Sequence, residues 1–139
     1  MRTKTTIFCA LFAMLALGSA QAFPHHSFAA EFDAAKPINL KGTITKVDFV
    51  NPHAWLYLNV TEEGKVVNWA IEMGSPNTLI RTGLTRNTVP AGTEVTIEGY
   101  RAKDGSATGT ATSIRLPDGR RLFAGNAAPI APHAGERGR

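Results

Sequence analysis

Between residues 54 and 73 the chain carries one pattern that strongly limits its fold. Residues 54–60 alternate, with Ala54, Leu56, Leu58 and Val60 on one parity and Trp55, Tyr57 and Asn59 on the other. A turn signal at residues 62–65 follows, and residues 66–73 form a second β-type run. Strict alternation with a period of two, interrupted by a short glycine-containing turn, is typical of a β-hairpin with one buried face. The sequence therefore predicts an antiparallel sheet.

Further β-type runs lie on both sides of this hairpin. A first run over residues 38–50 changes parity near Thr45 and Lys46, which predicts a β-bulge. Later runs cover residues 93–101, 108–116 and 121–123, each separated from the next by a turn signal. We expect five main strands and a short final hairpin strand.

One helical signal interrupts the strands. Ser75 is a good N-cap, Pro76 suits the first helical position, and Gly83 is a natural stop. These residues predict a short helix over 76–82 with Leu79 as its core contact. The order of three strands, a helix and two strands predicts an all-β fold, a small OB-like barrel of five to six strands. A small β-sandwich is the alternative.

The start of the chain is typical of a secretory signal peptide. Arg2 and Lys4 precede an apolar stretch over residues 7–17, and Ala20-Gln21-Ala22 supplies the small residues of a cleavage site. The apolar stretch is shorter than the roughly 20 residues that span a bilayer. We therefore divide the chain into a cleaved leader (1–22), a lead-in (23–37), the β domain (38–124) and a disordered tail (125–139). The expected location is the periplasm, with secretion as the second choice.

Removal of the leader changes the charge and the cysteine count. Without Arg2 and Lys4, 13 basic residues stand against 11 acidic ones, a net charge of +2. That small surplus favours no nucleic-acid partner. Cys9, the single cysteine, lies in the leader, so the mature chain has neither disulfides nor thiolate metal sites.

Histidines are then the best candidate metal ligands. Two stand in His25-His26-Ser27-Phe28, one in Asn51-Pro52-His53, and His133 lies in the tail. Imidazole suits copper first and zinc second among the divalent ions considered. We predict a site formed by His25, His26 and His53, with Glu72 or Met73 completing the shell. An amino-terminal copper clamp is excluded, because Pro24 has no backbone N–H. The alternative is structural, with His53 bonded to backbone in a tight bend and the histidine pair solvated.

These motifs also carry a resemblance. Together, the His25-His26-Ser27-Phe28 and Asn51-Pro52-His53 motifs resemble a family of small exported bacterial proteins whose domain has no known function. The segment from Trp69 to Gly83 is similar to that family too. The resemblance implies an exported single-domain protein, and it implies no activity.

A second candidate site is the face of the hairpin that carries the aromatic side chains. Trp55, Tyr57 and Asn59 share one face of their strand, and Asn68 and Glu72 share one face of the next. Aromatic side chains beside amides and a carboxylate suit a small molecule, a glycan or a protein segment. The alternative is that residues 28–32 or the short helix cover these rings.

Enzyme signatures are lacking in the sequence. It has no G-x-S-x-G, H-E-x-x-H or phosphate-loop motif. The sequence therefore predicts a non-enzymatic binding module with an unidentified periplasmic partner or small ligand.

Overall fold

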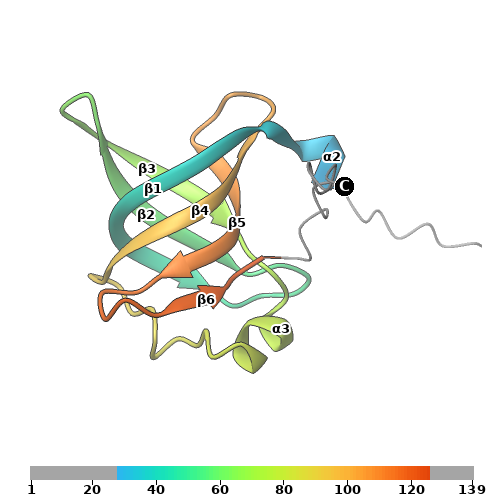
Figure 1. Cartoon of the computed structure of the whole chain (residues 1–139), viewed down its shortest axis with the longest axis vertical. Coiled ribbons are helices and arrows are strands. Elements are labelled where there is room, and N and C mark those ends of the chain that lie inside the picture. Colours follow the sequence, from blue (N-terminus) through green and yellow to red (C-terminus); the bar gives the residue numbers. More distant parts are fainter. Residues whose placement is uncertain (1–27, 126–139) are drawn as a thin grey trace, which may run out of the picture.

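The computed structural model describes residues 28–125, which form a closed β-sheet with two short helices (Figure 1). The elements are, in chain order, α2 (Phe28–Glu31), β1 (Phe32–Asp48), β2 (Trp55–Glu62), β3 (Lys65–Glu72), α3 (Pro76–Arg81), β4 (Glu94–Ala102), β5 (Thr108–Arg115) and β6 (Arg121–Phe123). In Figure 1, α2 lies beside the upper right of the sheet and α3 lies below it.

The strands form one six-stranded sheet in the order β3-β2-β1-β4-β5-β6. A parallel pairing of β3 with β5, over three residues from Ala70 to Glu72, joins the sheet into a ring of five strands. All other pairings are antiparallel. The predicted all-β class, with a short helix between the third and fourth strands, is confirmed.

Local signals placed several elements correctly. The register of β1 against β2 shifts between Ile44 and Lys46, where the parity change predicts a bulge. Glu63 and Gly64 have φ values of 48° and 79°, as a tight hairpin turn requires. The Oγ of Ser75 accepts a bond from the Thr78 N–H at the start of α3.

The first strand begins before the predicted run at residue 38. β1 begins at Phe32, which pairs with Ala102, and after an irregularity Pro37 pairs with Tyr100. Residues 32–37 carry no alternating apolar pattern, so the strand there depends on backbone pairing with β4. Residues 23–27 of the predicted lead-in lie outside the described residues.

At the other end, the described structure includes the first residue of the predicted tail. Gly125, predicted to begin the tail, is buried. The chain is fixed beside it, because the Gly74 N–H donates to the Ala124 carbonyl at 2.9 Å and the Ala124 N–H donates to the Thr112 carbonyl at 3.1 Å. Residues 126–139 of the predicted tail are not described.

The interior of the ring is apolar. Leu56, Leu58 and Ile71 are fully buried, and Leu79 of α3 closes one end, as its predicted core role requires. Burial of such side chains contributes about 1.5–3 kcal/mol each to folding. Neither helix within residues 28–125 is long and apolar enough to cross a membrane.

Candidate functional site

A belt of side chains crosses the outer face of the ring at one level. The ladder pairs Asp48 with Trp55, Trp55 with Glu72, Glu72 with Thr110, and Thr110 with Tyr100. Side chains of directly paired residues lie on the same face of a sheet. The neighbours of these residues along the strands, such as Leu56 and Ile71, are buried in the core. The belt therefore lies on the outside.

The side of β2 that carries Trp55 and Tyr57 faces outward, as predicted. Trp55 and Tyr57 are half-buried and Asn59 is exposed, whereas Leu56 and Leu58 have no exposed surface. On β3, Asn68 faces outward beside Asn59, and its Nδ2 donates to Asn59 Oδ1 at 2.8 Å. This bond fixes the relative orientation of the two side-chain amides.

The same face carries a cation, Lys46, that the sequence did not predict as part of a site. The ammonium of Lys46 lies 5.5 Å from the centroid of the Tyr57 ring, a cation–π distance, and 2.7 Å from Asp48 Oδ2. The hydrogen bond to the Asp48 carboxylate raises the pKa of the Lys46 ammonium above its usual value. The predicted bulge could have indicated this position, because the register shift between Ile44 and Lys46 places Lys46 opposite Tyr57 on the outer face.

At the end of the same face lie His53 and Glu72. Two backbone bonds fix the start of β2 against the end of β3: the Ala54 N–H donates to the Gly74 carbonyl at 3.1 Å, and the Met73 N–H donates to the Ala54 carbonyl at 2.8 Å. His53 Nδ1 then lies 3.1 Å from Glu72 Oε1. The Glu72 side chain is only 10% exposed, compared with 32% for His53.

The structure brings part of the predicted metal set together. His53 and Glu72 are in contact, whereas Met73 is fully buried in the core and does not share this face, because it follows Glu72 along the chain. No three histidine, cysteine or acidic side chains cluster within residues 28–125. His25, His26 and His133 lie outside the described residues.

Comparison with known proteins adds one family. A model described as a family of unknown function (DUF6152) matches residues 13–112. The chain belongs to this family. The expected relation to a domain of unknown function is thereby confirmed, and no function follows from it. No curated protein and no solved structure matches the chain.

The stretch matched by DUF6152 contains both candidate sites. It includes the two predicted histidine motifs and the whole β2–β3 hairpin, and it ends at Thr112 within β5. β6 lies outside it. The family match therefore covers β1 to β4 and the first part of β5.

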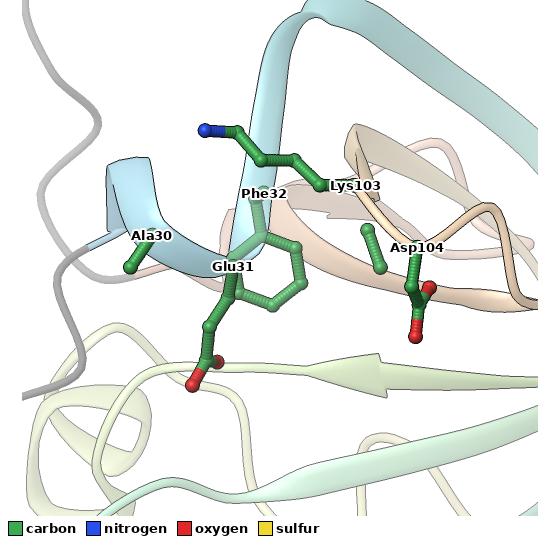
Figure 2. A pocket seen from close by; sticks show the side chains of 6 residues that line it. Ala30, Glu31, Phe32, Lys103 and Asp104 are labelled. Atoms are coloured by element: carbon green, nitrogen blue, oxygen red, sulfur yellow. The ribbon is translucent and has the colours of Figure 1, made fainter.

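Away from the belt, a shallow pocket of about 320 Å³ lies between α2 and the turn after β4. Its lining residues are Ala30, Glu31, Phe32, Ala102, Lys103 and Asp104. Figure 2 shows the carboxylates of Glu31 and Asp104 projecting to the same side, and the Lys103 ammonium to the other. The pKa of Asp104 is lowered, chiefly because the Ser106 hydroxyl and N–H donate to its carboxylate. These bonds occupy one oxygen of the carboxylate in local turn structure.

A charged cluster occupies the outer face of β4, β5 and β6. Glu98 accepts a bond from the Ser113 hydroxyl at 3.0 Å and from the Arg121 guanidinium, and Arg115 lies 3.7 Å from its other oxygen. The Ser113 bond and the two guanidinium groups hold the pKa of the Glu98 carboxyl below its usual range. This network stabilises the pairing of β6 with the ring.

Proposed function

We propose that this protein is an exported, non-enzymatic module that binds a transition metal ion, copper first and zinc second. The observation that carries the proposal is the contact of His53 with the buried Glu72 carboxylate, 3.1 Å from Nδ1 to Oε1. His25 and His26 are the proposed additional ligands, because imidazole is the best remaining donor in a mature chain without cysteine.

The contact supports a role for Glu72 in the proposed site. A metal-ligating histidine commonly donates its second ring N–H to a carboxylate, which fixes the ring and raises the basicity of the ligating nitrogen. In the observed contact, Nδ1 of His53 faces Glu72, so Nε2 would be the atom that holds a metal ion. A cation held by His53 would also offset part of the cost of burying the Glu72 carboxyl group. Glu72 would therefore orient His53, or ligate directly if the imidazole turns away.

Metal stoichiometry of the mature protein tests this proposal. Wild type, His53→Ala and His133→Ala would be purified without a tag, incubated with copper or zinc, desalted and measured by native mass spectrometry. We expect about one ion per chain in wild type and His133→Ala, and none in His53→Ala. An equal metal content in His53→Ala, or no metal in wild type, would overturn the proposal.

The aromatic face supports a second candidate function, the binding of a small molecule, a glycan or a protein segment. The specific observation is that Trp55 and Tyr57 both lie half-buried on the outer face, beside the Asn59–Asn68 amide pair. Flat rings next to fixed amides suit the apolar faces and hydroxyl groups of sugars. A glycan array with wild type and Trp55→Ala discriminates, because loss of binding in Trp55→Ala with metal content intact favours this function.

Export is the third part of the proposal. Residues 1–22 have the charged, apolar and small-residue regions of a cleavable leader. The intact mass of protein from the periplasmic fraction should correspond to a chain that begins at Phe23. A mass that retains residues 1–22 in every fraction would contradict cleavage.

A further inference from the structure

We propose that the outer face of β1 and β2 binds a small quaternary ammonium ion, and that the Lys46 side chain occupies this site when no such ion is bound. This inference rests on the second candidate function, ligand binding by the aromatic face, and names the chemical class of the ligand. It needs no metal ion. Its basis is an ammonium group that already lies against a ring and a carboxylate on this face.

Two neighbouring ladder pairs bring the four site residues together. Lys46 pairs with Tyr57, and Asp48 pairs with Trp55. Directly paired residues share a face of the sheet, and residues two apart along a strand are about 7 Å apart. Leu56, between the two aromatic residues, is fully buried, so both rings lie on the outer face. One ammonium, one carboxylate and two rings therefore form a single group of neighbours.

The third strand of this face adds a small side chain and a second carboxyl group. Ala70 pairs with Tyr57, and Glu72 pairs with Trp55. The methyl group of Ala70 is too short to cover the Tyr57 ring, which stays half-buried. Glu72, which contacts His53, lies beside Trp55. Two carboxyl groups next to two aromatic rings favour a cation over an anion or an uncharged ligand.

The Lys46 side chain shows how this face binds a cation. Its ammonium lies 5.5 Å from the centroid of the Tyr57 ring and 2.7 Å from Asp48 Oδ2, within the roughly 6 Å of a cation–π contact. The Lys46 side chain is 63% exposed, so it can turn into solvent without disturbing the core. A primary ammonium is strongly hydrated. A quaternary ammonium ion presents methyl groups to a ring and binds aromatic faces well, so it should displace Lys46.

Binding of choline to the metal-free protein tests this inference. The comparison ligand is 3,3-dimethylbutan-1-ol, which has the shape of choline without its charge. Amide signals in NMR titrations of wild type and Lys46→Met give the affinity and report whether each variant is folded. We expect choline to bind Lys46→Met about tenfold more tightly than wild type, as for an internal group that occupies the site about nine-tenths of the time. The largest shifts should lie at Trp55 and Tyr57, and the uncharged alcohol should not bind.

Lys41→Met is the matched control for the change in charge. Lys41 is an exposed lysine of the same strand, and its partner is Glu94 and not a ring. We expect this variant to bind choline as wild type does. Adding Asp48→Asn or Tyr57→Leu to Lys46→Met should remove the gain in affinity. Equal choline affinity in Lys46→Met and Lys41→Met, equal binding of choline and the alcohol, or no choline binding to Lys46→Met would each overturn the inference.

The outcomes separate this inference from the functions proposed above. If choline does not bind Lys46→Met while a glycan binds wild type and not Trp55→Ala, the ammonium site is wrong and the aromatic face remains a binding site. If neither ligand binds, the second candidate function fails as well. Metal binding is decided by the separate measurement on His53→Ala, because the choline titrations contain no metal ion.

Discussion

Glu72 and Trp55 are direct cross-strand partners on the outer face of the β2–β3 ladder. The same Glu72 contacts His53 through its carboxylate. The predicted histidine site and the predicted aromatic site are therefore adjacent parts of one surface. A ligand or an ion bound at either part lies within reach of the other.

This adjacency predicts a fluorescence response to copper. Paired residues have their Cβ atoms about 4.5–5.5 Å apart, so an ion near Glu72 and His53 lies close to the Trp55 indole. Copper(II), with an unfilled d shell, quenches a nearby indole. We expect quenching in wild type and in Trp69→Phe, and its loss in Trp55→Phe, because Trp69 faces the core. Zinc, which has a filled d shell, should bind without this quenching; equal quenching in Trp55→Phe would place the copper elsewhere.

Metal affinity should depend on pH in one direction. Protons compete with the metal for imidazole nitrogen, so affinity should weaken as the pH falls through about 6.5. Titrations by isothermal calorimetry from pH 8 down to pH 4.5 would measure the change. Constant affinity over that range would exclude histidine ligation.

Glu98 should make stability depend on pH under acid conditions. Its pKa is lowered in the folded state by the Ser113 hydroxyl and by the Arg121 and Arg115 guanidinium groups. A lowered pKa means that the contribution to stability is complete above the unfolded-state pKa and is lost as the pH falls through the folded-state pKa. Glu98→Gln should therefore lower the free energy of unfolding by about 1 kcal/mol at pH 7.

Urea denaturation of wild type and Glu98→Gln at several pH values checks this expectation. The difference between the two proteins should shrink as the pH falls below 4.5, the reference pKa of a glutamate. Lys41→Met serves as the comparison, because its ion pair with Glu94 is well exposed and should contribute little. A difference that stays the same at low pH would assign the effect of Glu98 to packing.

Gly99 should tolerate no side chain. A Cβ atom there would lie 1.8 Å from the Thr110 carbonyl oxygen, which belongs to the neighbouring strand and cannot rotate away. Gly99→Ala should therefore cost about 3 kcal/mol or more of stability and lower the melting temperature. Glu94→Ala on the same strand, an exposed position, should change stability by less than about 0.5 kcal/mol. Similar melting temperatures for both variants would mean that β4 and β5 separate more easily than their pairing indicates.

Much of the fold could be predicted from local patterns. The alternation over residues 54–60, the Glu63-Gly64 turn and the Ser75 cap each depend on chemistry within a few residues. The outward orientation of Trp55 and Tyr57 followed from the same alternation, because their neighbours Leu56 and Leu58 need burial. The bulge near Lys46 followed from a change of parity.

The tertiary structure decided the contacts between segments that are distant in the sequence. The strand at residues 32–37 forms because its backbone pairs with β4, a partner that no local pattern names. The β3–β5 pairing closes the ring, so that the side on which Met73 lies becomes the enclosed core and the side on which Glu72 lies becomes the outer face. The edge-on contact between the Phe28 and Tyr100 rings joins residues 72 positions apart. Side-chain periodicity is a property of the local chain, whereas ring closure depends on backbone pairing between distant strands. His53 meets Glu72 because the backbone of Ala54 bonds to Met73 and Gly74 across the hairpin.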